Sequence, residues 1–181
     1  MSIIEIDVHS AKPKDHLQIF FGMGCFWGAE RKFWSVDGVL TTAVGYAGGH
    51  HENPKYDEVC SGETGHAEIV RVFFNPEVNS LENLMKVFWE SHDPTQLNRQ
   101  GNDIGSQYRS IILIDKNELL PLIQSSKNKY QERLNYKSAG KIKTEIGVLK
   151  KFYLAENYHQ KYLHKNPNGY CGLKGTGVDY I

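Results

Sequence analysis

The chain has 181 residues, and its 21 Lys and Arg residues balance its 21 Asp and Glu residues, so the formal net charge is zero. This balance gives no electrostatic basis for binding nucleic acid or an acidic membrane. A chain of this length buries roughly 70% of its unfolded surface when it forms one domain. We therefore expect a single domain over residues 1–181, with a core at about 15–150 and a tail at about 151–181.

The N-terminal segment and the cysteines indicate the cellular setting. Residues 1–7 carry acidic groups and too short an apolar run for a signal peptide. No stretch approaches the ~18 apolar residues of a membrane span. The three cysteines, Cys25, Cys60 and Cys171, are odd in number and form no Cys-x-x-Cys pair, which argues against a disulfide scaffold. We expect a cytoplasmic protein.

Apolar patterning and turn residues predict the elements in chain order. The first half should contain a strand at 17–21, a helix at 26–35, a strand at 39–46, a loop at 48–65 and a strand at 66–74. The second half should contain a helix that Ser80 caps, a polar loop at 93–107, a strand at 108–115, a helix at about 118–134 and a strand at about 144–149. Pro121 is tolerable only because it falls in the first turn of its helix.

This order predicts the fold class. A β-α-β-β-α-β sequence of elements is the split β-α-β signature of a ferredoxin-like core. The fold class would then be α+β, a two-layer sandwich in which helices cover a mixed sheet. After residue 149 the tail is rich in glycine and is predicted to be irregular.

Cys25 lies between glycines, at the junction of the first predicted strand and the first predicted helix. Unpaired backbone N–H groups and the macrodipole favour negative charge at a helix N-terminus. A contribution of ~1 kcal/mol lowers a thiol pKa by roughly 0.7 unit, so neighbouring groups must add to it for full ionisation. A buried structural cysteine is the alternative.

Glu68 is the second position of interest. Strand alternation places it on the same side as Val70 and Val72, whereas Arg71 points the other way. Burial on an apolar face raises the pKa of a carboxyl group and makes it a proton donor near neutral pH. The alternative is a glutamate at a strand end that reaches solvent or pairs with Lys or Arg.

Further candidates are aromatic or lie in loops. Tyr56 and Tyr108 could donate hydrogen bonds into a site from strand ends, or could simply pack. Trp27 is a candidate for lining an apolar pocket, whereas Phe26 belongs to a helical stripe that is typical of a core. Asp103 lies in a loop, where aspartates carry function or form turns.

Tests for metal and nucleotide sites give negative expectations. His159 and His164 are five residues apart, not four, and no His-Glu-x-x-His occurs, so we expect no metal site. The glycines at 22, 24 and 28 do not match the dinucleotide fingerprint, and no Walker motif is present. We therefore expect no cofactor.

Six ordered blocks, from about residue 18 to 173, resemble the peptide methionine sulfoxide reductases of the A type. The blocks are Gly24-Cys25-Phe26-Trp27-Gly28, Gly45-Tyr46-x-Gly48-Gly49, residues 56–68 with Tyr56, Cys60 and Gly65-His66-Ala67-Glu68, Phe88-Trp89-x-x-His92-Asp93-Pro94, residues 100–110 with Asp103 and Tyr108, and residues 159–171 with His159-Gln160-x-Tyr162-Leu163 and Tyr170-Cys171.

The resemblance implies roles for the candidates. Cys25 would be the nucleophile, and Glu68 would give a proton to the sulfoxide oxygen, which Tyr56 and Tyr108 would hydrogen-bond. A sulfenic acid on Cys25 would then condense with Cys171, the resolving cysteine, to form a disulfide. Repair enzymes are specific for one sulfoxide epimer, and the A type implies the S epimer.

The resemblance also implies the substrates and the partner. Phe26 and Trp27 would hold the substrate methyl group, and Asp103 would help to bind or orient the substrate. The substrates would be oxidised proteins and peptides, and also free methionine sulfoxide, and thioredoxin would be the reductant. The sequence has no thiol after Cys171, so Cys171 should meet the reductant directly. We read Cys60 as a packing residue and expect a monomer.

Two other functions stay open at this point. A cysteine hydrolase or acyltransferase would place an imidazole within hydrogen-bond reach of Cys25. A redox sensor without enzymatic activity would oxidise Cys25 and Cys171 with peroxide and turn over no sulfoxide.

Overall fold

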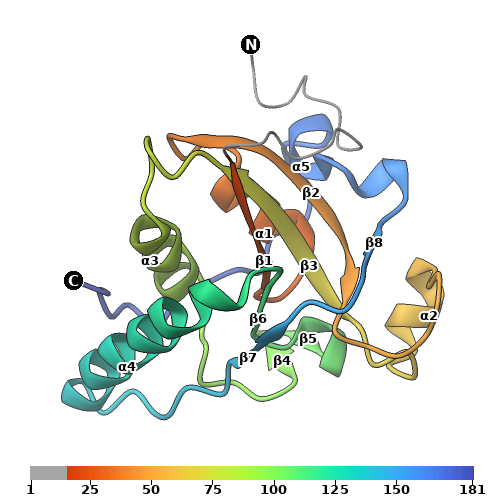
Figure 1. Cartoon of the computed structure of the whole chain (residues 1–181). Coiled ribbons are helices and arrows are strands. Elements are labelled where there is room, and N and C mark those ends of the chain that lie inside the picture. The colour runs from red at the N-terminus through yellow and green to blue at the C-terminus, as the bar shows by residue number, and fades with distance from the viewer. Residues whose placement is uncertain (1–15) are drawn as a thin grey trace.

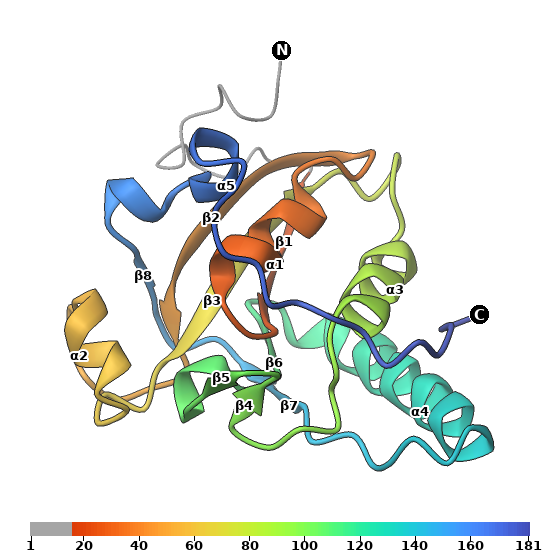
Figure 2. The same cartoon turned by 180° about the vertical axis from the view of Figure 1, so that it is seen from behind.

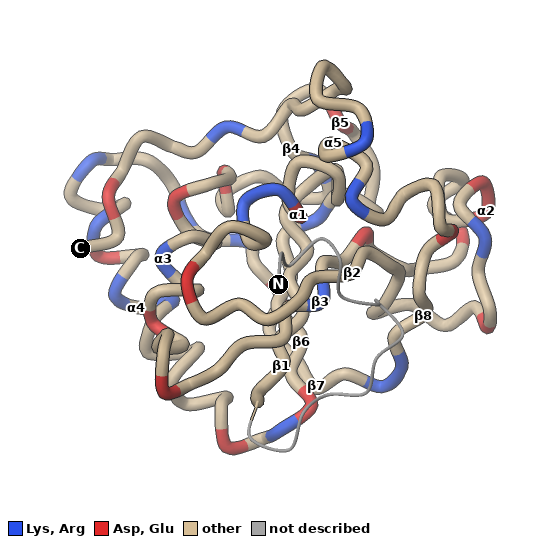
Figure 3. Tube along the Cα trace, turned by 90° about the horizontal axis from the view of Figure 1, so that it is seen from above, with Lys and Arg blue, Asp and Glu red and all other residues tan. Residues whose placement is uncertain are grey.

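A computed structural model describes residues 16–181 of the chain (Figure 1). Residues 1–15, on which the prediction about a signal peptide rests, lie outside the described residues. Within residues 16–181, no helix has the length and apolar character needed to cross a membrane. Basic and acidic residues are interspersed along this part of the chain (Figure 3).

A six-stranded sheet forms the centre of the fold. Its strands follow the order β7 (Glu145–Val148), β6 (Ile111–Ile114), β1 (Leu17–Gly22), β3 (Ala67–Phe74), β2 (Val39–Ala47) and β8 (Phe152–Leu154). Neighbouring strands are antiparallel except β6 and β7, which are parallel. In the β2–β3 register Glu68 lies opposite Tyr46.

Three helices cover one face of this sheet, namely α1 (Phe26–Phe33), α3 (Leu81–Ser91) and α4 (Leu120–Tyr136) (Figures 1 and 2). Their apolar side chains share one core with sheet residues such as Phe21 and Val70. A smaller cluster on the opposite face includes Phe20 and Ile69. The fold is therefore a mixed α+β fold in which the two sheet faces are covered unequally.

Two helix predictions are confirmed. Ser80 caps α3, since its hydroxyl oxygen accepts a hydrogen bond from the N–H of Asn83 at 3.3 Å. Pro121 lies at the start of α4, where its missing N–H has no helical acceptor to lose. A 3-10 turn, η3 (Asn117–Leu119), precedes α4 and accounts for the earlier start that we predicted.

Several short elements lie where the sequence predicted loops. The helix α2 (Tyr56–Cys60) lies in the predicted loop 48–65. The predicted loop 93–107 contains a hairpin of β4 (Arg99–Gln100) and β5 (Asp103–Ile104), followed by the 3-10 turn η2 (Ser106–Tyr108). The strand predicted at 108–115 therefore begins only at Ile111, and Tyr108 belongs to the 3-10 turn.

The prediction of an irregular tail from residue 150 is wrong for its first part. This part contains β8, the 3-10 turn η4 (Asn157–His159) and the helix α5 (Tyr162–Lys165). The residues after Lys165 form a continuous stretch without helix or strand. The ordered part is fixed by β8 pairing with β2, a tertiary contact that local composition does not reveal.

Candidate active site

Cys25 is the N-cap residue of α1, as the sequence predicts. The turn that leads from β1 into the helix includes Gly24, whose φ of 102° is accessible to glycine and strained for other residues. The backbone N–H groups of Trp27 and Gly28, in the first helical turn, favour the charged form of the Cys25 thiol, although its side chain makes no capping hydrogen bond. The local chain path thus aims this sulfur at the positive end of the helix.

The predicted lowering of the Cys25 pKa is wrong. Burial raises the pKa of this thiol well above its ordinary value, and the negative charges of Glu68 and Asp103 raise it further. The backbone N–H groups of Trp27 and Gly28 at the helix N-terminus act in the opposite direction but are outweighed. The free site therefore holds a protonated thiol, because desolvation disfavours a thiolate more than the helix end favours it.

Glu68 is buried at 2% exposure on the face of β3 that α1 covers, as strand alternation predicts. Its Oε2 accepts a hydrogen bond of 2.8 Å from the backbone N–H of Phe26. Burial raises the Glu68 pKa to about 8, the charge of Asp103 adds to the rise, and the bond from Phe26 opposes it. The solvent-exposed alternative is thus excluded, and Glu68 is a protonated acid at neutral pH.

Tyr56 and Tyr108 reach the same region from two different elements. Tyr56 begins α2, and Tyr108 ends η2. Burial raises the pKa of both phenols, and the Glu68 charge contributes to both shifts. Both hydroxyls therefore keep their protons and can donate hydrogen bonds. In the free site the Tyr56 hydroxyl bonds the Cys60 thiol.

Asp103 lies in β5 at the edge of the site. Its carboxylate oxygens accept hydrogen bonds from the hydroxyl of Tyr170 at 3.2 and 3.3 Å. Burial raises the pKa of Asp103, and the bond from Tyr170 lowers it. Because Tyr170 directly precedes Cys171, this contact brings the tail to the site.

The two aromatic residues after Cys25 lie in different surroundings. Phe26 is only 1% exposed, and its ring packs 5.9 Å from that of Tyr46 and 5.0 Å from that of His159, between centroids. Trp27 is half-buried, and its indole stacks on Tyr162 at 3.8 Å with an angle of 14° between the planes. Trp27 is therefore the more accessible of the two rings.

His159 is a site residue to which the sequence analysis assigned no role. Its Nδ1 accepts a hydrogen bond of 3.0 Å from the indole N–H of Trp27. The ring proton then lies on Nε2, which is 3.7 Å from Oε2 of Glu156. Burial lowers the His159 pKa, which keeps the ring neutral and able to accept. The sequence feature that could have identified His159 is the block His159-Gln160-x-Tyr162, because it contains both residues that contact the Trp27 ring.

Cys171 lies over the first turn of α1. All three cysteines are free, so Cys25 and Cys171 are not bonded to each other. A Cβ atom on Gly28 would lie 2.7 Å from the Cys171 sulfur and 2.9 Å from Cδ1 of Leu173. The tail crosses α1 here (Figure 2). Gly28 thus gives the tail room to bring its thiol to the helix end where Cys25 lies.

The interpretation of Cys60 as a packing residue is wrong. Cys60 is exposed at the end of α2, a helix that the sequence analysis did not predict. Its thiol contacts the Tyr56 hydroxyl and lies near enough to Glu68 for that charge to raise the Cys60 pKa. Cys60 is therefore a surface thiol at the rim of the site.

No metal centre accompanies these side chains within the described residues, and a hollow elsewhere on the fold lies apart from them. Among residues 16–181, no group of three or more His, Cys, Asp or Glu side chains could hold a metal ion. A hollow of about 440 Å³ is lined by residues from the loop after β2, from β6 and from β7, and none of the candidates for chemistry lines it. The chemistry-bearing side chains instead converge on the N-terminus of α1.

Comparisons with known proteins agree with this arrangement. The family model described as peptide methionine sulfoxide reductase matches residues 17–178. The chain is 54% identical to peptide methionine sulfoxide reductase MsrA of Photobacterium profundum, over 96% of this chain and 83% of that protein.

Two solved structures are also similar. Methionine sulfoxide reductase A of Corynebacterium diphtheriae has a TM-score of 0.84 and 42% identity, over 88% of this chain and 79% of that one. Mxr1 of Saccharomyces cerevisiae in complex with Trx2 has a TM-score of 0.56 and 27% identity, over 87% of this chain and 92% of that one. By sequence and by fold, the chain belongs to the peptide methionine sulfoxide reductase family and is an oxidoreductase of the A type.

Proposed function

We propose that this protein reduces the S epimer of methionine sulfoxide, in proteins, in peptides and as the free amino acid, and so repairs oxidative damage. The observation that carries the proposal is the pairing of a thiol and a buried acid at one helix end. Cys25 caps α1, and Glu68 accepts the N–H of the next residue, Phe26. A sulfoxide needs both groups, because its sulfur becomes electrophilic only when its oxygen is protonated or strongly hydrogen-bonded.

In the first half-reaction the Cys25 sulfur attacks the sulfoxide sulfur while the Glu68 proton passes to the sulfoxide oxygen. The S–O bond of the substrate then breaks as its oxygen passes to the Cys25 sulfur, and the transient bond between the two sulfurs breaks as well. Methionine leaves, and Cys25 carries the oxygen as a sulfenic acid. Tyr56 and Tyr108 donate hydrogen bonds to the oxygen as negative charge develops on it. For this role the Tyr56 hydroxyl turns from Cys60 to the substrate.

The proton balance explains why both the thiol and the acid are protonated in the free site. Glu68 gives one proton to the oxygen and takes one from the Cys25 thiol, so it ends the half-reaction as it began. The thiol proton thus reaches the sulfenic acid through Glu68, and no bulk acid or base is needed. A Glu68 pKa of about 8 suits this exchange, since transfer in both directions is then feasible near neutral pH.

Substrate binding is assigned to the groups beside Cys25. We propose that the half-buried Trp27 ring contacts the methyl group of the substrate, and that the buried Phe26 ring forms the floor under that contact. His159 and Tyr162 fix the Trp27 ring. Asp103 exchanges its hydrogen bond from Tyr170 for one from the substrate backbone.

In the second half-reaction the Cys171 thiol attacks the Cys25 sulfenic acid. A sulfur–sulfur bond forms, the S–O bond breaks, and the oxygen leaves as water with the thiol proton. Thioredoxin then reduces the disulfide by thiol–disulfide exchange. The similarity to Mxr1 of yeast, a protein solved in complex with Trx2, supports thioredoxin as the reductant.

The two alternative functions find less support. Among residues 16–181 the groups that favour a Cys25 thiolate are backbone N–H groups, and the imidazole of His159 accepts a hydrogen bond from Trp27. This does not fit a hydrolase with a Cys-His pair. A redox sensor without enzymatic activity would not need Glu68 as a buried proton donor.

We also propose a single domain that acts as a monomer in the cytoplasm, with a ferredoxin-like core and a glycine-rich tail. The strand order β6-β1-β3-β2 within the sheet, with α1 and α3 as the connecting helices, supports the ferredoxin-like core. One unfolding transition and a monomeric mass in solution would support the single domain and the monomer.

The test of the function uses two peptides that contain either the S or the R epimer of methionine sulfoxide, with thioredoxin and its reductase. We expect many turnovers of the S peptide and none of the R peptide, and loss of turnover in Cys25→Ser. Cys60→Ser is the matched control and should keep the parent rate. Equal turnover of both epimers, or turnover by Cys25→Ser, would contradict the proposal.

A further inference from the structure

The end of the chain is buried although it has no regular structure. Tyr180 is 1% exposed and Val178 is 8% exposed, whereas the final residue, Ile181, is exposed. The segment lies beside α3 and α4, away from the helix end where Cys25 lies (Figure 2). We name residues 176–180 the C-terminal anchor.

The C-terminal anchor is bound through both backbone and side chains. The Tyr180 N–H donates to Oε1 of Glu90 in α3 at 2.7 Å, and its hydroxyl donates to Oγ of Ser126 in α4 at 3.0 Å. The Tyr130 hydroxyl of α4 donates to the Val178 carbonyl at 3.0 Å. Burial of a tyrosine ring with its hydroxyl paired makes this a firm attachment.

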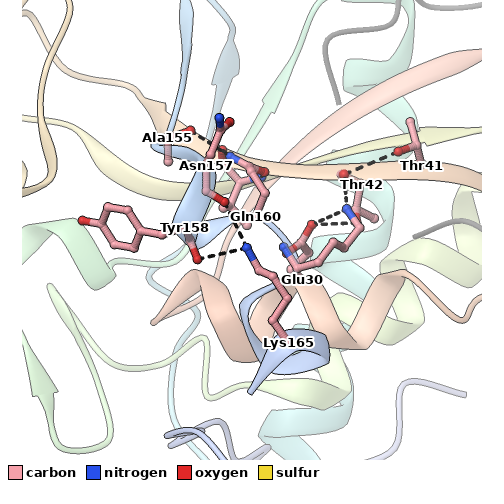
Figure 4. A network of polar contacts seen from close by, with 10 residues as sticks. Glu30, Thr41, Thr42, Ala155, Asn157, Tyr158, Gln160 and Lys165 are labelled. Atoms are coloured by element: carbon pink, nitrogen blue, oxygen red, sulfur yellow. Dashed lines mark hydrogen bonds and ion pairs between the residues drawn. The ribbon is translucent and has the colours of Figure 1, made fainter. Parts of the chain in front are cut away.

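The chain before Cys171 is fixed as well, by polar contacts that Figure 4 shows. The backbone N–H of Lys161 donates to Oε2 of Glu30 at 2.9 Å, and the Lys161 ammonium donates to Oε1 of Glu30. The Gln160 side chain bonds both the N–H and the carbonyl of Val44 in β2 at 2.8 Å. These partners are buried, so the segment before α5 is tied to α1 and β2.

Residues 166–175 therefore form a loop that is held at both ends, and Cys171 lies within it. A chain held at both ends samples a smaller volume than one held at one end, so its thiol has a higher effective concentration at a nearby target. Cys171 already lies against Gly28, one turn from Cys25. A disulfide requires the two Cα atoms to come within about 7 Å, which a local shift of this loop supplies.

We propose that Tyr180 is a positioning residue for disulfide formation between Cys25 and Cys171. Its attachment to α3 and α4 keeps the loop across α1, so that Cys171 meets the Cys25 sulfenic acid. The inference rests on the proposed function, because it assigns Tyr180 to the second half-reaction. Tyr180 makes no contribution to the first half-reaction, because the Cys171 thiol takes no part in that step.

The experiment measures the two half-reactions separately in one protein sample without added reductant. Methionine formed after mixing with a sulfoxide peptide reports the first, and loss of free thiols with a mass change reports the disulfide. The variants are Tyr180→Ala, Tyr180→Phe and a chain that ends at Gly177. A chain that lacks only the exposed Ile181 is the matched control.

We expect Tyr180→Ala and the shortened chain to form methionine at the parent rate and the disulfide about tenfold more slowly or worse. Tyr180→Phe keeps the buried ring and should recover most of the disulfide rate, and the control should match the parent. The shortened chain keeps the test valid where Tyr180→Ala does not fold, since it removes residues 178–180 of the anchor together and leaves an open surface in place of an internal cavity.

Two results would overturn the inference. Disulfide formation at the parent rate in the shortened chain would show that the anchor does not position Cys171. Equal slowing of both half-reactions would show that Tyr180 acts only through general stability. A parent chain that forms no methionine would instead contradict the proposed function, so the two failures are distinguishable.

Discussion

The carboxyl group of Glu68 accepts a hydrogen bond from the backbone N–H of Phe26 at 2.8 Å, in the first turn of the helix that Cys25 caps. The acid from β3 and the thiol from the β1–α1 junction are thereby held at one helix end. The acid is 2% exposed, and its pKa is raised to about 8, so it keeps its proton at neutral pH. This relationship leads to the first two predictions.

Replacing Glu68 with Gln should slow the first half-reaction by about 100-fold at neutral pH, the lower range for loss of a general acid. The parent loses the same proton as pH rises through about 8, so its advantage over the variant should shrink above that pH. Single-turnover methionine formation across pH 5–10 measures both effects. The exposed Glu63→Gln is the control, and a parent-to-variant ratio that stays constant with pH would argue against Glu68 as the donor.

The same pKa predicts how stability depends on pH. In the unfolded chain Glu68 loses its proton near its ordinary pKa of 4.5, whereas in the folded chain it keeps the proton up to a pKa of about 8. The stability linked to this proton is therefore complete below pH 4.5 and is lost as pH rises through 8. Relative to Glu68→Gln, the parent's free energy of unfolding should fall by up to about 1.4 kcal/mol per pH unit in this window. Urea unfolding of both proteins at several pH values measures the difference, and parallel curves would contradict the raised pKa.

Gly28→Ala should separate helix stability from access of the tail thiol. Alanine favours a helix over glycine by about 1 kcal/mol, so the variant should be at least as stable as the parent. Its Cβ would lie 2.7 Å from the Cys171 sulfur and should displace the tail. Methionine formation should continue while disulfide formation slows. In Gly147→Ala, the control, the new Cβ meets only Cδ2 of Leu113, at an ordinary 3.7 Å. An unchanged disulfide rate in Gly28→Ala would show that the tail does not need this space.

His159→Leu should weaken substrate binding through Trp27. The indole N–H loses its acceptor at 3.0 Å, and the ring that lies against Tyr162 is no longer fixed. We expect KM for a sulfoxide peptide to rise about tenfold, equivalent to about 1.4 kcal/mol of binding. His159→Gln offers another acceptor and should recover part of the loss. Steady-state kinetics of the three proteins give the result. An unchanged KM in His159→Leu would show that His159 does not support substrate binding through Trp27.

The sequence predicts the main elements because long amphipathic patterns determine them. Alternation along β3 places Glu68 on the covered face, and the Ser80 cap marks the start of α3. Sequence reasoning misses the short elements because they contain too few residues to show a periodic pattern of apolar side chains. The five residues of α2 and the four of α5 are examples. The latter depends on Lys161 and its partner Glu30, which are distant in sequence.

The charge state of the site also lies beyond sequence reasoning. The position of Cys25 at a helix end predicts a lowered pKa, yet the structure raises it because the thiol is buried beside Glu68 and Asp103. Neither burial nor the approach of those carboxyl groups follows from local sequence. The exposure of Cys60 was missed for the same reason, since it depends on how α2 lies on the fold.

The most direct test of the account is the amount of methionine formed per chain by the reduced protein without added reductant. The account predicts that the parent forms one methionine per chain and ends with a Cys25–Cys171 disulfide. Cys171→Ser should form the same amount and stop at a Cys25 sulfenic acid, and Cys25→Ser should form none. Methionine formation by Cys25→Ser at the parent yield would contradict the account.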